Sequence, residues 1–216
     1  DLLFYDDNHE HRKKEKFSKR DLNPFADVKD FLRFKELRAM GILGIMISMT
    51  TPFVVLVAPY IVIQKMGLAN IHISMILFVM GIANISQYFF CILADKIGKG
   101  KSIVIGLAFN ALVLTLLFFT RQYAAFLIFI FMRAIGGSLW NVSAWAFMSD
   151  LAEKHNIEGK VVGSYSAISR IAIAVSFIIS GALLERLEFG IFLVYGAFIF
   201  IGLLVAGKTI LRAEKR

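Results

Sequence analysis

The sequence predicts an all-α, polytopic membrane protein. Its 216 residues are 58% hydrophobic, and the mean hydropathy is +0.70. After about residue 38, apolar runs long enough to cross a bilayer recur, and charged turns separate them; one crossing needs roughly 20 apolar residues. A soluble fold would have to bury six nearly apolar helices in one small core, so we expect the helices to span a membrane.

Six segments have the length and composition of membrane spans. They cover residues 39–63, 73–94, 102–120, 123–149, 161–184 and 189–208. The chain then divides into a cytoplasmic loop at 1–38, a transmembrane domain at 39–208 and a cytoplasmic tail at 209–216. Within the loop, Asn23-Pro24 is typical of a helix start. The apolar residues that follow at helical spacing predict either a short amphipathic helix on the membrane surface or a lead-in to the first span.

The basic residues predict the orientation. An even number of spans places both termini on one side, and 19 of the 24 Lys and Arg residues then lie on that side. The opposite turns hold only Lys65, Arg121 and Arg186. Because basic loops stay inside, we expect cytoplasmic termini, in the plasma membrane. Residues 1–38 hold ten basic and nine acidic residues, a balance that excludes a nucleic-acid partner.

The turn after the second span, LADKIGKGK at residues 93–101, is unusually charged. Gly98 and Gly100 give a tight hairpin its backbone freedom, and three lysines hold it at the inner face. Topology does not require Asp95, since acidic residues contribute little to orientation. An aspartate at the end of a span can, however, accept hydrogen bonds from the N-terminus of another helix.

This stretch resembles the loop signature of the major facilitator superfamily. It departs from the family pattern at Cys91, where the family has glycine, and at Gly100, which separates two basic residues. Both departures suggest the weaker second copy of the signature, and hence the carboxy-terminal half of a twelve-helix transporter. Arg133-x-x-x-Gly137 resembles the fourth-helix signature, which is usual in the amino-terminal half and favours the other assignment.

The resemblance implies two further properties. The six helices form two inverted three-helix repeats, and the partner is the other six-helix half, either upstream in the same polypeptide or in a second copy. Asp95 belongs to a latch that meets the opposite half and locks the outward-open state. Asp150 either pairs with Lys96 or Lys99 and joins that latch, or belongs to a plain solvated turn. The predicted latch residues are Asp95, Lys96, Gly98, Lys99, Lys101 and Asp150.

Polar residues inside the spans predict a cavity. They concentrate on the first, second, fourth and fifth spans, and helices that line a water-filled path carry such groups. Polar side chains also join helices to one another, which is the alternative for each. The cavity candidates are Asn84, Gln87, Tyr88, Arg133, Trp140, Asn141 and Arg170. On the fifth span, Ala172, Ser176 and Ser180 form a stripe of small residues that predicts close packing.

These patterns predict half of a secondary transporter that moves a small solute by alternating access. The alternative is a six-helix membrane scaffold without transport activity. We do not expect an enzyme, because HExxH, GxSxG and paired-cysteine motifs are absent and all four histidines lie outside the spans. No cofactor or metal is expected. The arginines suit an anionic substrate and the aromatic residues a flat or apolar one, and the sequence does not decide between them.

Overall fold

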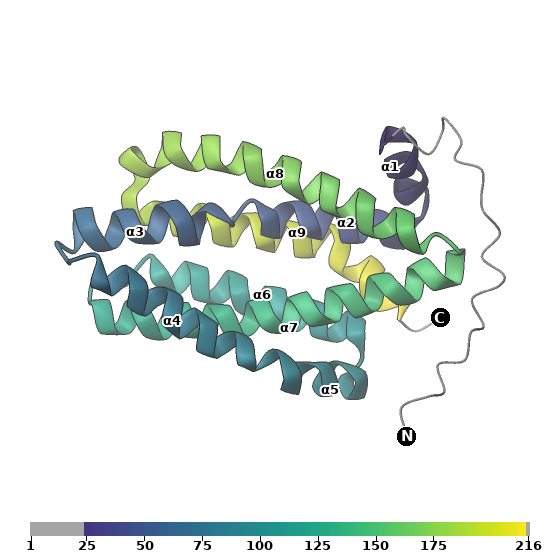
Figure 1. The fold of residues 1–216 in the computed structure, drawn as a ribbon, viewed down its shortest axis with the longest axis horizontal. Helices are drawn as coiled ribbons and strands as arrows, with labels where there is room; N and C mark the ends of the chain where they lie inside the picture. The colour runs from purple at the N-terminus through teal and green to yellow at the C-terminus, as the bar shows by residue number, and fades with distance from the viewer. Residues whose placement is uncertain (1–23, 215–216) are drawn as a thin grey trace, which may run out of the picture.

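The computed structural model describes residues 24–214, and its helices lie side by side along one long axis (Figure 1). In chain order these are α1 (Pro24–Arg33), α2 (Lys35–Ser48), the π-helical η1 (Phe53–Val57), α3 (Ala58–Tyr60), the π-helical η2 (Ile61–Lys65), α4 (Ile71–Ile85), α5 (Gln87–Ile97), α6 (Lys99–Leu117), α7 (Tyr123–His155), α8 (Glu158–Leu187), the 3-10 turn η3 (Glu188–Gly190) and α9 (Ile191–Ala213).

Much of this helical structure is apolar enough to cross a membrane. Four stretches qualify by length and hydropathy, namely Lys35–Lys65, Lys99–Leu117, Tyr123–His155 and Gly159–Ala213. Helices α4 and α5 together make a fifth if their bent pair is one span. The fourth stretch contains both α8 and α9, which run in opposite directions (Figure 1). The described chain is therefore an all-α, polytopic membrane fold.

The first predicted span is helical but irregular. Proline has no N–H to donate and disturbs the helix before it. Pro52 lies in the turn between α2 and η1, and Pro59 lies in α3 between two π-helical stretches. A π-helix has a wider turn than an α-helix. The π-helical stretches η1 and η2 lie beside the two prolines, where a backbone N–H donor is missing. Residues 39–63, which the sequence predicts as the first span, lie within the apolar stretch Lys35–Lys65, and a turn at residues 49–51 interrupts its helical pattern.

The second predicted span, residues 73–94, is also broken. Helices α4 and α5 meet at Ser86 with a bend of 42°. The Ser86 hydroxyl donates to the Ala83 carbonyl at 2.5 Å, and the Ser86 N–H reaches the same oxygen at 3.1 Å. A serine that bonds the preceding turn in this way competes with the regular helical ladder and bends the helix. The sequence did not predict this break.

Helix α6 packs closely against α7 and α9 because small residues lie at both contacts. A Cβ atom built on Gly106 of α6 would lie 2.8 Å from the Trp140 backbone nitrogen and 3.0 Å from the Gly136 carbonyl oxygen, both in α7. On the other side, a Cβ on Gly196 of α9 would lie 3.2 Å from the Ala111 carbonyl oxygen. The backbones therefore approach too closely for any larger residue.

The predicted small-residue stripe on α8 is buried. Ala172, Ser176 and Ser180 are 7%, 0% and 2% exposed. The Ser180 hydroxyl lies 2.7 Å from the Tyr195 hydroxyl, which joins α8 to α9. The stripe therefore packs against neighbouring helices, as the sequence predicts.

The two ends of the bundle differ in what they hold. One end carries α1, the α5–α6 turn, the α7–α8 turn and the last residues of α9 (Figure 1). The opposite end carries the α6–α7 and α8–α9 turns, and there Lys65 forms an ion pair of 2.6 Å with Glu188. Helix α1 matches the predicted lead-in helix, and its Phe31 is fully buried. The expected cap, Asn23, lies outside the described residues.

The close α6–α7 contact predicts a position-specific cost for one methyl group. We expect Gly106→Ala to destabilise the protein by about 1–3 kcal/mol, because backbone atoms cannot move aside as side chains do. The matched control is Gly81→Ala in α4, where a Cβ would meet nothing within 4 Å. Thermal unfolding in detergent measures both, and equal midpoints for the two variants would contradict the contact.

Candidate functional site

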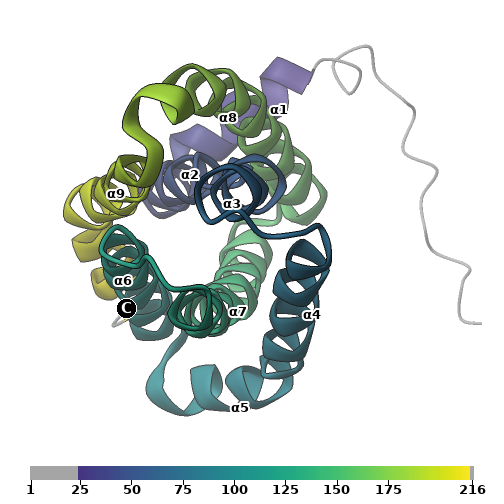
Figure 2. The same cartoon turned by 90° about the vertical axis from the view of Figure 1, so that its left-hand side faces the viewer.

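A polar cavity of about 350 Å³ lies between helices that are far apart in the sequence. The turn after α2, the α4–α5 junction, α6 and α7 all contribute to its wall (Figure 2 shows these helices end-on). The polar residues of the wall are Thr50, Thr51, Asn84, Gln87, Asn110, Arg133, Ser138 and Asn141. Its volume is within the usual range of small-molecule sites.

Five of the seven predicted cavity residues meet in this wall. They are Asn84, Gln87, Arg133, Trp140 and Asn141. The structure places the other two elsewhere: Tyr88 is 70% exposed and packs against the Phe89 ring, and Arg170 is exposed on α8. The cavity thus has one arginine and one indole ring, whereas the sequence left two arginines and several aromatic residues as candidates.

Helical spacing explains why α7 contributes so much of the wall. Arg133, Gly137 and Asn141 are four residues apart and lie on one helix face. Across the cavity, the Asn84 side-chain oxygen accepts a hydrogen bond of 3.2 Å from the Ser138 hydroxyl, which joins α4 to α7. Gln87 follows directly after the bend at Ser86. The bend that interrupts the second span therefore lies at the cavity wall.

Arg133 lies ten residues from the first residue of α7, or about 15 Å along the helix axis at 1.5 Å per residue. This distance is half the thickness of a hydrocarbon core of about 30 Å. Its Nη2 atom donates to the Thr50 hydroxyl oxygen at 3.3 Å, and its guanidinium carbon lies 4.4 Å from the centre of the Phe53 ring. The buried Nε atom has no hydrogen-bond partner among the described residues.

Thr50 receives this hydrogen bond because its own proton is already used. The Thr50 hydroxyl donates to the Ile47 carbonyl at 2.8 Å, so its oxygen is left to accept from Arg133. The irregular turn before Pro52 frees that carbonyl from the regular ladder. The cavity candidates from the sequence did not include Thr50, and the threonine pair beside a proline was the available signal.

Asn110 and Ser138 complete the wall, and sequence analysis did not include either among the candidates. Asn110 is 1% exposed, and its side-chain oxygen has no hydrogen-bond partner among residues 24–214. Gly136 and Gly137 leave room for its amide, whose nitrogen would lie 3.4 Å and 3.6 Å from a Cβ at these positions. No group of three or more potential metal ligands occurs within the described part of the chain.

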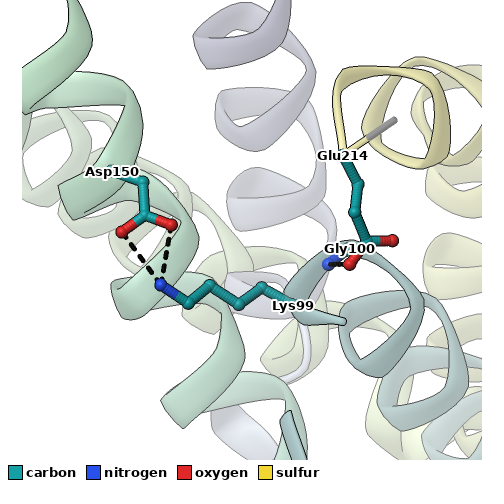
Figure 3. A network of polar contacts seen from close by, with 4 residues as sticks. All are labelled: Lys99, Gly100, Asp150 and Glu214. Atoms are coloured by element: carbon teal, nitrogen blue, oxygen red, sulfur yellow. Dashed lines mark hydrogen bonds and ion pairs between the residues drawn. The ribbon is translucent and has the colours of Figure 1, made fainter. Parts of the chain in front are cut away.

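A second polar cluster lies at the α5–α6 turn. Lys99 donates to both carboxylate oxygens of Asp150, at 2.9 Å and 2.7 Å (Figure 3). This is one of the two pairings that the sequence predicts for Asp150. Because the carboxylate is 58% exposed, the pair contributes at most about 1 kcal/mol to stability. Its main consequence is to fix the start of α6 against α7.

Glu214 holds the other side of the same turn. Its carboxylate accepts a hydrogen bond of 3.0 Å from the Gly100 N–H, in the first turn of α6 (Figure 3). The carboxylate thereby caps a helix N-terminus, where negative charge is favourable. Gly98 has a φ angle of 101°, and a Cβ there would overlap Glu214. Both the backbone conformation and the close carboxylate therefore require glycine at position 98.

The remaining predicted latch residues lie at the surface of this cluster. Asp95, Lys96 and Lys101 are exposed. Asp95 borders a hollow of about 310 Å³ together with Lys99, Asp150 and Glu214. It makes no hydrogen bond or ion pair with another described residue. Glu214, which the sequence analysis placed in the tail without a role, occupies the helix N-terminus within this chain.

Two substitutions separate the roles of these carboxylates. We expect Glu214→Ala to lower the free energy of unfolding by about 0.5–2 kcal/mol, the usual effect of losing a helix cap. Asp95→Ala should change it by less than about 0.5 kcal/mol, as for a surface residue without contacts. Thermal unfolding of the purified variants measures both, and a larger loss from Asp95→Ala would contradict this assignment.

Comparison with known proteins supports the membrane assignment. A family model, that of the Major Facilitator Superfamily, matches residues 39–216. Searches of curated proteins and of solved structures each found no match. The matched range contains both the cavity and the α5–α6 turn cluster. Since this range covers most of the sequence, the chain belongs to the Major Facilitator Superfamily.

Proposed function

We propose that the chain is one half of a secondary transporter that moves a small solute by alternating access. The observation that carries this proposal is the polar cavity around Arg133. A membrane helix pairs or hydrates a charge at this depth, because an exposed one costs several kcal/mol. A scaffold would have no use for an open polar hollow at mid-depth, whereas a transporter binds its solute there.

The proposed topology has six spans in two inverted three-helix repeats. Helices α2–α3, α4–α5 and α6 form the first repeat, and α7, α8 and α9 form the second. The reversal at Glu188, whose φ angle is 49°, supports counting α8 and α9 as two spans. Helix α8 has 30 residues and α9 has 23, and each is long enough to cross a bilayer.

We further propose that both termini are cytoplasmic, in the plasma membrane. The end of the bundle that carries α1 and the last turn of α9 also carries Lys96, Lys99 and Lys101. The positive-inside rule favours the cytoplasm for this end. The chain would be the carboxy-terminal half, and the other six-helix half would close the path from the opposite side.

In this arrangement the α5–α6 turn cluster is a cytoplasmic latch. Lys99, Asp150 and Glu214 fix the turn within this half, and Asp95 has no partner within residues 24–214. Its exposed carboxylate is therefore free to accept hydrogen bonds from a helix N-terminus of the other half. Closing and opening that contact would bias the two halves between inward-open and outward-open states.

Solvent access tests the transporter proposal against the scaffold alternative. In a Cys91→Ala background, we expect Asn84→Cys to react with a small, water-soluble maleimide in native membranes. The matched control is Leu204→Cys, which is also 13 residues from the first residue of its helix and lies outside the cavity. Leu204 is 65% exposed and should face lipid. Equal, slow labelling of both cysteines would contradict a wet cavity and favour the scaffold.

A further inference from the structure

Among the described residues, the two groups that contact the Arg133 guanidinium are neutral. Thr50 presents a hydroxyl oxygen whose proton is committed to Ile47, and Phe53 covers one face of the guanidinium with its ring. These contacts hold the group in place but bring no negative charge. Meanwhile the Nε–H is removed from solvent and has no acceptor among the described residues. The positive charge is therefore positioned but not neutralised.

The described stretches that form the cavity wall contain no acidic residue. Positions 37–94 and 96–149 contain no Asp or Glu, and neither do positions 159–184 and 189–213. On either side of Arg133, the nearest acids in sequence are Asp95 and Asp150, and both lie in the α5–α6 turn cluster at the end of the bundle. An unpaired charge inside a membrane is strongly unfavourable. Among residues 24–214, no hydrogen bond or ion pair brings a negative charge to Arg133.

We propose that the cavity binds a small organic anion, whose carboxylate or sulfonate group is held by Arg133. This inference rests on the proposed transport function and names its substrate class. A guanidinium donates two parallel hydrogen bonds to such a group, and charge-assisted bonds of this kind are among the strongest in proteins.

The rest of the wall suits the uncharged part of the same ligand. Trp140 offers an indole ring, and Asn84, Gln87 and Asn141 offer amides that both donate and accept hydrogen bonds. The positive charge of Arg133 disfavours a cation in the same space. With Arg170 outside the cavity, the wall has a single formal charge, so the structure favours a monoanionic group over a polyanion.

A pair of thiol reagents with opposite charges tests this directly. Gly137 lies one helical turn from Arg133 and lines the cavity, and a Cβ there would come no closer than 3.6 Å to its nearest neighbour. In a Cys91→Ala background, we therefore place a cysteine by Gly137→Cys. We measure the reaction rate of this cysteine with two methanethiosulfonates, one bearing a sulfonate and one bearing a trimethylammonium group. Each rate is divided by the rate at which the same reagent reacts with free 2-mercaptoethanol.

We expect the anionic reagent to be favoured by about tenfold or more, since the thiol lies within several ångströms of an unscreened cation. Adding Arg133→Gln should abolish the preference for the anionic reagent. Adding Arg133→Lys should retain it, because lysine keeps the positive charge, and this variant is the control for folding of the site. Benzoate should slow the reaction, and the neutral isostere benzamide should not.

The possible failures can be told apart. If both reagents react at equal rates, or if Arg133→Gln leaves the preference unchanged, the cavity contains water but does not bind an anion through Arg133. The anion proposal is then wrong, and the transport proposal is unaffected. If a carboxylate from the other half neutralises Arg133, the preference is likewise absent in native membranes, and the inference is overturned. If neither reagent reacts, the cavity is closed to water and the transport proposal fails with it.

Discussion

A positive charge held at mid-depth is the constraint on which the rest of the structure depends. Burying Arg133 requires partners, and the described residues supply only neutral ones, from a segment that proline has made irregular. Thr50 in this segment accepts a hydrogen bond from the guanidinium, and Phe53 covers it with its ring. The irregular first span, the bend at Ser86 and the polar face of α7 are thus parts of one arrangement around a single guanidinium.

Close packing of α6 against α7 and α9 holds the helix that carries Arg133 in place. Gly106 and Gly136 bring α6 and α7 into backbone contact, while Gly196 brings α9 against the other side of α6. These contacts fix the α7 face that carries Arg133, Gly137 and Asn141. At the end of the bundle, Lys99 and Glu214 fix the start of α6 from two directions. A rigid half of this kind can rock against a partner without deforming its own binding wall, which is what alternating access requires.

The sequence was informative where composition and periodicity determine the result. Apolar runs located the helical segments, and the polar residues within the spans predicted five residues of the cavity wall, Arg133 and Asn141 among them. It failed where a single hydrogen bond or proline redirects the backbone, as at Ser86 and Pro52, because such local competition leaves hydropathy unchanged. Arg170 and Tyr88 show the same limit: a polar residue in a span does not reveal which way its helix is rotated. Glu214 caps α6 across more than a hundred residues, a contact that no local pattern encodes.

The most direct test of the account is to locate an anion beside Arg133. Crystals of the protein soaked in bromide would give an anomalous signal wherever the ion binds, and exposed lysines such as Lys101 provide an internal reference. The account predicts a bromide within hydrogen-bonding distance of the Arg133 guanidinium, inside the cavity. Bromide at surface lysines but none at Arg133 would contradict it, and the buried charge would then need a different explanation.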